Sequence, residues 1–388
     1  MRKSRLLVPS DMDGLYHVVS RVVDRRMIFG EEEKKRFREL LVAYAGFSGI
    51  EVVAWCLMDN HFHLLLHVPS RERVVPEKLP EKEVLRRVRL IYKGAALADI
   101  ERVLGMCVDA ESRRRYLETF TRRMGDLSLF MKTLKQRFTQ WYNGRNRRKG
   151  TLWEDRYRSV AVEIQDLATF GHAARIVAAY IDLNPVRAGM VEDPAEYEWS
   201  GYGRAVRGEK ACVRGVVGLW GRQKGVKGAL AEYRMFLFEE GSEESQETQD
   251  NKTRDPRTGE MKTRFGIDAR KVWEERKRGG RLPLSVMLRL KSRYLVDGAA
   301  IGSAEFLRRL TGGRLETASL QDSRHKREKA EKASINDASD ASDAAGVSEA
   351  GNEGTRAEFP GGKKGVAMRF GQWGGLRVLR DLRVNVFA

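Results

Sequence analysis

Two histidines, His61 and His63, lie two residues apart in the apolar run 61–68, which is typical of a β-strand. Side chains at this spacing leave the same face of a strand, with Cα atoms roughly 6.5 Å apart. Both imidazoles could therefore bind one divalent cation. His67 has the same parity, but it lies roughly 13 Å beyond His63, too far to share that ion. A hydrogen-bonded histidine pair in a half-buried sheet is the alternative interpretation.

A tyrosine and an asparagine, Tyr180 and Asn184, are four residues apart in a helix predicted from about Gln165 and stopped by Pro185. This spacing places a phenol and an amide oxygen on one helix face. A phenol, with an ordinary pKa of about 10, is a poor nucleophile until a cation polarises a phosphate beside it. The alternatives are a core aromatic for Tyr180 and a helix C-cap for Asn184.

The segment 132–158 holds nine Lys or Arg residues against two acids, interleaved with Trp141, Tyr142, Trp153 and Tyr157. Cations that follow phosphates and rings that stack on bases are typical of sites for single-stranded or hairpin nucleic acid. A solvated basic face with core aromatics is the alternative. The residues expected to contact DNA are Lys132, Lys135, Arg145, Arg147, Arg148, Lys149, Trp153, Arg156 and Arg158.

The overall charge points the same way, because 72 Lys and Arg against 54 Asp and Glu leave +18 on 388 residues. Such an excess favours a polyanion, with nucleic acid preferred to an anionic membrane surface. Three scattered cysteines argue against disulfides, and no signal peptide or membrane span is evident, so we expect a cytoplasmic protein. Phosphate-binding GxxxxGK[ST], GxSxG, HExxH and zinc-finger spacings are absent from the sequence.

Apolar runs at 16–23, 51–58 and 61–68 predict strands, and Asp59 and Asn60 between the last two tolerate the left-handed backbone of a hairpin turn. The segment 151–163 also ends like a strand, and helices are expected over 31–47, around 127–141 and from about 165, so the order is β-α-β-β-α-β-α. The hairpin must be antiparallel, so we predict an α+β fold with a partly antiparallel sheet.

The chain divides by composition into five parts. We expect one α+β domain over 1–220, a helical tail and polar linker over 221–264, and a helical accessory region, a possible DNA-binding unit, over 265–320. A low-complexity, disordered stretch over 321–364 follows. The last segment, 365–388, is expected to pack on the accessory region.

Four separated segments together resemble the single-tyrosine HUH, or IS200-like, transposases, and within them the REP-associated tyrosine transposases. They are YHVVSRVVDRRMIF (16–29), CLMDNHFHLLLHVP (56–69), RRKGTLWEDRYRS (147–159) and YIDLNPVRAGMVEDPAEYEWSGY (180–202). The resemblance implies a ferredoxin-like HUH endonuclease domain with a carboxy-terminal extension. It also implies DNA, as single strands or hairpin repeats, as the partner.

The resemblance further implies a role for each candidate residue. His61 and His63 would bind Mg²⁺ or Mn²⁺, Asn184 would be the third ligand, and Tyr180 would be the nucleophile that forms a 5′-phosphotyrosine. Two other functions stay open: a non-catalytic DNA-binding regulator with the same fold, and a ribonuclease or hydrolase that activates water. Tyr142 and Tyr157 also stay possible nucleophiles, and a monomer and a homodimer are both compatible with the sequence.

Overall fold

The computed structural model describes residues 6–74, 79–241, 252–254, 261–263, 299–311, 370–373 and 376–379. The expected disordered stretch, 321–364, and most of the expected accessory region lie outside these residues. Within them, no helix is both long enough and apolar enough to cross a membrane.

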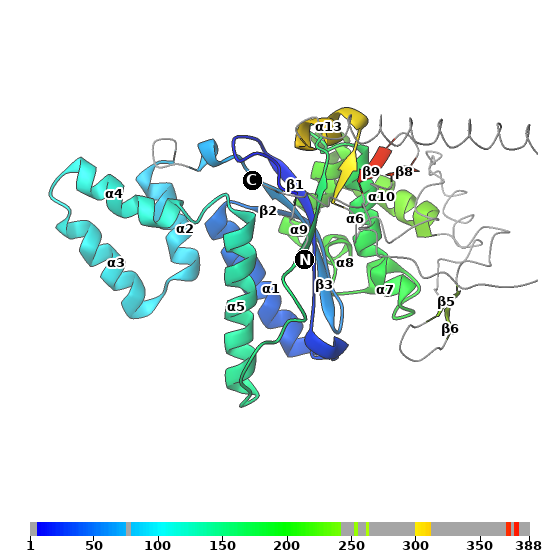
Figure 1. Cartoon of the computed structure of the whole chain (residues 1–388), viewed down its shortest axis with the longest axis horizontal. Helices are drawn as coiled ribbons and strands as arrows, with labels where there is room; N and C mark the ends of the chain where they lie inside the picture. Colours follow the sequence, from blue (N-terminus) through cyan, green and yellow to red (C-terminus); the bar gives the residue numbers. More distant parts are fainter. Residues whose placement is uncertain are drawn as a thin grey trace, which may run out of the picture.

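The core of the fold is an antiparallel sheet (Figure 1). Its first four strands are β1 (Gly14–Arg21), β2 (Glu51–Leu57), β3 (His61–Val68) and β4 (Arg158–Val162). They lie in the order β2-β3-β1-β4, and each neighbouring pair among them is antiparallel. This is the strand order of a ferredoxin-like sheet, so the predicted α+β class is confirmed, and the four predicted strands are present in the predicted sequence order.

Helices cover both faces of this sheet (Figure 1). The first face carries α1 (Glu31–Ser48) and α5 (Leu127–Arg145), and the second carries α6 (His172–Asp182), α8 (Gly201–Val206) and α9 (Lys210–Trp220). α1 begins with three glutamates, whose negative charges interact favourably with the positive N-terminal end of the helix. Gly49 caps its C-terminal end with a φ of 69°, a left-handed conformation that suits glycine. Each face of the sheet is therefore covered by a different set of helices.

An aromatic cluster fills the face under α1 and α5. Phe62 of β3 lies 4.6 Å from Phe37 of α1 and 5.6 Å from Trp153, measured between ring centroids. Phe138 of α5 packs on Phe37 from the other side. Because residues alternate along a strand, Phe62 on this face places its neighbours His61 and His63 on the other.

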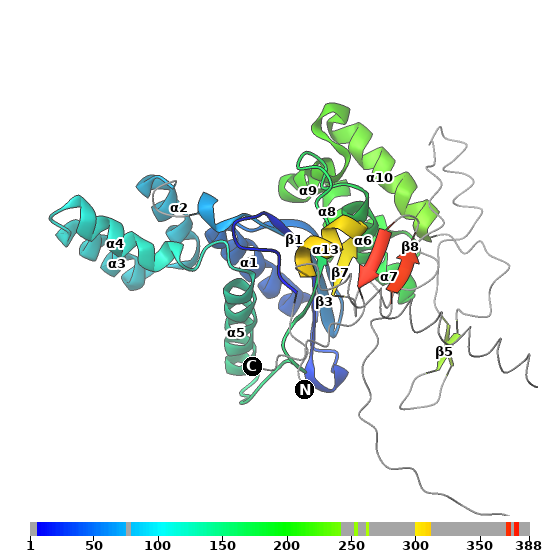
Figure 2. The ribbon, with the colours of Figure 1, turned by 45° about the horizontal axis from the view of Figure 1, so that its top comes forward.

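A three-helix insertion between β3 and α5 projects away from the sheet (Figures 1 and 2). Its helices are α2 (Glu81–Ile91), α3 (Gly94–Met106) and α4 (Ala110–Thr121). They bury a small core of their own, which includes Val84, Val88, Ile100 and Leu104 and reaches Phe47 of α1. These three helices contact the rest of the protein through α1, on the first face of the sheet.

Short strands from the second half of the chain extend the sheet beyond β4. β7 (Ala300–Gly302) pairs in parallel with β4, and β9 (Leu376–Leu379) and β8 (Phe370–Trp373) follow. α13 (Ala304–Thr311) comes directly after β7. The predicted domain boundary at residue 220 separated β7, β8 and β9 from the first domain, whereas these strands extend the sheet of that domain. The remaining elements are α10 (Gly225–Gly241), β5 (Lys252–Arg254) and β6 (Met261–Thr263).

Candidate active site

The two histidines project from the start of β3 onto the face covered by α6. In the antiparallel register His61 lies opposite Arg21 and His63 opposite Val19 of β1, and the two rings are 5.0 Å apart at 76°. Burial lowers the pKa of His61 to about 4, and Arg21 adds to the decrease. Burial lowers the pKa of His63 too, since it is only 2% exposed. Both imidazoles are therefore neutral near pH 7, the form in which histidine binds metals.

The turn before His61 is held by the loop that follows β1. The amide of Val22 donates to the carbonyl of Asn60 at 2.9 Å, and that of Phe29 to Asp59 at 3.0 Å. The buried ammonium of Lys34 bonds to the Asp59 carboxylate at 2.7 Å. Neither Asp59 nor Asn60 adopts a positive φ. The predicted two-residue turn is present, but the hydrogen bonds from these neighbours stabilise it, and its backbone is not left-handed.

Tyr180 lies on α6 with its ring against the histidines. Its centroid is 5.7 Å from that of His63 and 5.8 Å from that of His17, both in edge-to-face geometry, and the residue is 7% exposed. The Arg187 guanidinium lies 5.1 Å above the same ring. The structure thus brings the candidate nucleophile to one of the candidate metal ligands.

The helix that carries Tyr180 begins later than expected, at His172 instead of about Gln165. The preceding loop turns at Phe170 and Gly171, which have φ values of 56° and 87°. The side chain of Gln165 also accepts a hydrogen bond from the His172 amide at 2.8 Å. The turn at Phe170 and Gly171 and this hydrogen bond keep residues 165–171 in a loop, although the sequence pattern predicted that the helix would include them.

Asn184 begins the short helix α7 (Asn184–Arg187), one turn after Tyr180. Its amide nitrogen donates to the carbonyls of Tyr180 at 2.8 Å and Ile181 at 3.2 Å. Asn184 therefore caps α6, as one of the two interpretations predicted. The same bonds turn Oδ1 away from these carbonyls, and no described residue donates a hydrogen bond to that oxygen.

Three arginines surround this group of residues. Arg21 lies opposite His61, and Arg158 of β4 lies opposite Val19, the partner of His63, so both share the histidine face. Burial lowers the pKa of the Arg21 guanidinium, and the charges of Arg25 and Arg158 add to this. With Arg187 over Tyr180, the site combines neutral imidazoles, a phenol and cations suited to phosphate.

The basic segment lies beside the histidine end of the sheet. The carbonyl of Leu152 accepts a hydrogen bond from the Val23 amide at 3.0 Å, and the backbone amide of Glu154 donates to the carbonyl of Arg21 at 3.0 Å. Lys132, Arg147, Lys149 and Arg156 are exposed there. Three other expected DNA contacts also bond to the protein itself: Lys135 to Asp155, Arg145 to Glu32, and Arg148 to Thr151.

Trp153 requires a correction. It was expected to stack on bases, but it is 7% exposed and belongs to the aromatic cluster under α1 and α5. Its indole nitrogen donates to the Thr139 hydroxyl at 2.9 Å. Both its faces and its polar atom are therefore engaged inside the protein, because the ring fills the core beside Phe62.

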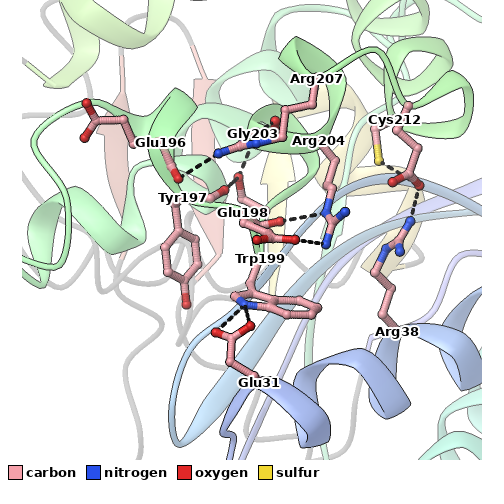
Figure 3. A network of polar contacts seen from close by, with 12 residues as sticks. Glu31, Arg38, Glu196, Tyr197, Glu198, Trp199, Gly203, Arg204, Arg207 and Cys212 are labelled. Atoms are coloured by element: carbon pink, nitrogen blue, oxygen red, sulfur yellow. Dashed lines mark hydrogen bonds and ion pairs between the residues drawn. The ribbon is translucent and has the colours of Figure 1, made fainter.

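Polar contacts fasten the segment after α7 to α1 (Figure 3). The Trp199 indole donates to Glu31 at 2.9 Å, and Arg38 pairs with Glu209. The Tyr197 hydroxyl donates to the carbonyl of Leu57 at the end of β2 at 2.6 Å. These bonds fix the chain that leaves Asn184 against the sheet, so they help to hold α6 and α7 over the histidines.

Asp182, between Tyr180 and Asn184, is a buried carboxyl at 1% exposure. The Tyr233 hydroxyl donates to it at 2.5 Å and the Tyr202 amide at 3.2 Å. Burial raises its pKa from 3.8 to about 7, and these two hydrogen bonds offset only part of that increase. Between about pH 4 and pH 7, the folded protein retains a proton that the unfolded chain loses, so stability falls as pH rises through this range.

We expect Asp182→Asn to stabilise the protein at pH 8 by roughly 2–4 kcal/mol, because the neutral amide avoids a buried charge. Its Oδ1 can accept from the Tyr202 amide, and its Nδ2 can donate to the Tyr233 hydroxyl, which reverses the direction of that bond. The gain should shrink as pH falls toward 4, where the carboxyl is protonated in the folded protein and begins to be protonated in the unfolded chain as well. Urea unfolding of both proteins at pH 4.5, 6 and 8 measures this. A difference in stability that does not change with pH would contradict the prediction.

The site also contains residues that the sequence alone did not single out. His17 and Arg21 lie on the predicted first strand and have the parity of its buried face, which is a signal that could have drawn attention to them. Arg187 lies seven residues after Tyr180, a spacing of about two helical turns. Asn60 had been assigned only to the turn.

Comparison with known families bears on this arrangement. Residues 12–76 match the family model described as "Transposase IS200 like". The resemblance to the IS200-like transposases is thereby confirmed. The matched segment runs through β1, α1, β2 and β3, so it contains His17, His61 and His63 but ends before Tyr180. It supports a transposase-type nuclease acting on DNA.

Other comparisons give less. No curated protein matches the chain. Among solved structures, the chain is similar to one described as a REP-associated tyrosine transposase bound to a REP hairpin, at 17% sequence identity and a TM-score of 0.32. The alignment covers 54% of this chain and 87% of that one. A likeness at this level does not establish the branch of the family or the DNA that this chain binds.

Proposed function

We propose that this protein is a metal-dependent DNA nuclease and strand transferase that cleaves and rejoins single-stranded or hairpin DNA through a 5′-phosphotyrosine at Tyr180. The observation that carries the proposal is the contact of the Tyr180 ring with His63, 5.7 Å between centroids, on the face shared with His61. The IS200-like match over residues 12–76 supports it. Placement in the REP-associated branch is part of the same proposal.

The residues fit a divalent cation. Among the described residues, no three His, Cys, Asp or Glu side chains gather to form a metal site, so the donors would be two imidazoles and the Asn184 oxygen. Both imidazoles are neutral near pH 7 and each has its Nδ1 atom in a hydrogen bond. Mg²⁺ or Mn²⁺ bound there would polarise the phosphate of the scissile bond.

The protein's own residues would perform the rest of the reaction. Tyr180 Oη would form a bond to phosphorus while the bond from phosphorus to the 3′-oxygen breaks. The phenol loses its proton and the departing 3′-oxygen gains one, so no oxidant or nucleotide is needed. Arg21, Arg158 and Arg187 would hold the phosphate oxygens against the nucleophile. Reversal of the step from the free 3′-OH would rejoin the strands.

The test is incubation of the protein with end-labelled single-stranded DNA bearing a hairpin repeat from beside its own gene, with Mn²⁺, with Mg²⁺ or with EDTA. We expect a covalent adduct on a denaturing gel in the presence of metal only. Mass spectrometry of the digested adduct should find the nucleotide on Tyr180. Cleavage without any adduct would favour the hydrolase, in which water is the attacking group.

A non-catalytic DNA-binding protein is the second candidate, and a specific observation favours it. Tyr180 is 7% exposed and Asn184 caps α6, so both side chains already have local structural roles. Binding of the hairpin DNA without cleavage under either metal would support this candidate. The proposal of catalysis would then fail.

Exposed cations of the basic segment should set the affinity for DNA. We expect Arg147→Gln combined with Lys149→Gln to weaken binding of single-stranded DNA about 3- to 10-fold at 0.1 M salt, because two phosphate contacts are lost. The slope of log affinity against log salt should fall by about 1.4. Fluorescence anisotropy over a salt series measures both quantities.

The matched control is Arg222→Gln combined with Lys227→Gln. It removes the same charge from exposed positions beside and within α10, outside the basic segment. Equal weakening by both double variants would show that net charge alone, and not this segment, determines binding.

A further inference from the structure

The side chain of Asn60 bridges the turn and the first histidine. Its Nδ2 donates to the carbonyl of Arg25 at 3.1 Å, and its Oδ1 lies 2.6 Å from Nδ1 of His61. A carbonyl oxygen only accepts, so the amide nitrogen must face Arg25 and the amide oxygen must face His61. That oxygen also only accepts, hence the proton of the neutral His61 ring is on Nδ1. Nε2 of His61 then has a lone pair available.

His17 makes the corresponding contact to the second histidine. It is completely buried, and its Nε2 lies 3.0 Å from Nδ1 of His63, with the two rings stacked at 19°. One proton lies between these two nitrogens. When His63 donates it, Nε2 of His63 can accept a cation, whereas a proton donated by His17 requires His63 to be protonated on Nε2. Only the first arrangement is compatible with metal binding.

From these two contacts we infer that His17 and Asn60 are positioning residues, which hold His63 and His61 protonated on Nδ1 and thereby leave both Nε2 atoms for a divalent cation. The inference rests on the proposed function, because it assigns partners to the ligands of that same site. The hydrogen-bond partners of metal-bound histidines are usually carboxylates, carbonyls or water, and they fix the tautomer and the ring orientation. Here a neutral imidazole and a neutral amide take that place.

The surroundings of His17 argue against a purely structural role. Its cross-strand neighbours are Leu65 on β3 and Val160 on β4, and Leu15 and Val19 flank its face of β1. Burial of an imidazole is unfavourable without hydrogen bonds, and the apolar neighbours on these strands supply none. The bond that His17 makes to His63 leads directly to a candidate ligand.

Four variants test the inference through Mn²⁺ affinity, measured by electron paramagnetic resonance or calorimetry without DNA. We expect His17→Leu and Asn60→Ala each to weaken Mn²⁺ binding about 10- to 100-fold. His17→Gln, whose amide oxygen can accept the His63 proton, should stay within about threefold of wild type. The double variant His17→Leu with Asn60→Ala should be weaker than either single variant. Asn60 is in a partly exposed turn, so its variant remains informative even if His17→Leu folds poorly.

A spectroscopic readout separates positioning from simple loss of packing. Long-range ¹H–¹⁵N spectra of the metal-free protein should show His61 and His63 protonated on Nδ1, and His61 should lose this preference in Asn60→Ala. Mn²⁺ affinities equal to wild type in His17→Leu and Asn60→Ala would overturn the inference, as would a His61 ring protonated on Nε2. Tight Mn²⁺ binding by wild type without any DNA adduct would overturn the proposed catalysis and leave this inference standing.

Discussion

Tyr180→Phe is expected to abolish the covalent protein–DNA adduct and to lower strand cleavage by at least about a thousandfold, because the variant lacks the attacking oxygen. The phenyl ring keeps the packing against His17 and His63 and the position under Arg187. Stability should therefore change by about 1 kcal/mol or less, and the affinity for single-stranded DNA should stay within about twofold. Denaturing electrophoresis, thermal unfolding and anisotropy measure the three quantities.

Two other tyrosines provide matched controls. Tyr142 and Tyr157 lie in the basic segment and were possible nucleophiles from the sequence. Both are about as buried as Tyr180, but the Tyr142 ring packs on Phe138, and the Tyr157 hydroxyl is 3.1 Å from that of Ser128. Tyr142→Phe and Tyr157→Phe should leave adduct formation close to wild type. Cleavage that survives Tyr180→Phe but disappears in either control would exclude Tyr180 as the nucleophile.

The sheet could be predicted because its signals are local. Side chains alternate along a strand, which places Phe62 on one face and both histidines on the other, and pairing with β1 shows that register. Asp59 and Asn60 marked the turn correctly, although their conformation depends on Val22 and Phe29 in another loop. The three residues of β7 could not be predicted in this way, since a strand so short has no detectable period and pairs with β4 from far along the chain.

The sequence could predict which site residues lie close together only where both residues are on one helix or strand, because spacing along one element determines which side chains share a face. His61 with His63, and Tyr180 with Asn184, meet that condition. His17 does not: it lies directly opposite Leu65 and contacts His63 diagonally across two strands, which requires the register to be known. Trp153 was wrongly predicted to contact DNA. An aromatic residue between cations gives the same sequence pattern whether its ring stacks on a base or, as here, packs in the core.

Loss of both candidate ligand histidines is the second large effect that we expect. His61→Ala combined with His63→Ala should lower metal-dependent cleavage at least about a thousandfold, because two neutral nitrogen donors disappear. DNA affinity without metal should change less than about threefold, since Arg21, Arg158 and Arg187 remain. His61→Ala alone tests the same point with less risk to folding, because His61 is partly exposed whereas His63 is buried.

His67 supplies the control for this experiment from the same strand and the same face. Its ring bonds to Asp13 at 3.2 Å and lies 5.2 Å from Phe170, at the other end of β3 from His61. His67→Ala removes an imidazole of the same parity, so cleavage and Mn²⁺ affinity should stay near wild type. Equal losses from His61→Ala and His67→Ala would mean that the histidines act through the stability of β3, and the metal role would be rejected. A selective loss from His61→Ala would locate the metal at the end of the strand that faces Tyr180.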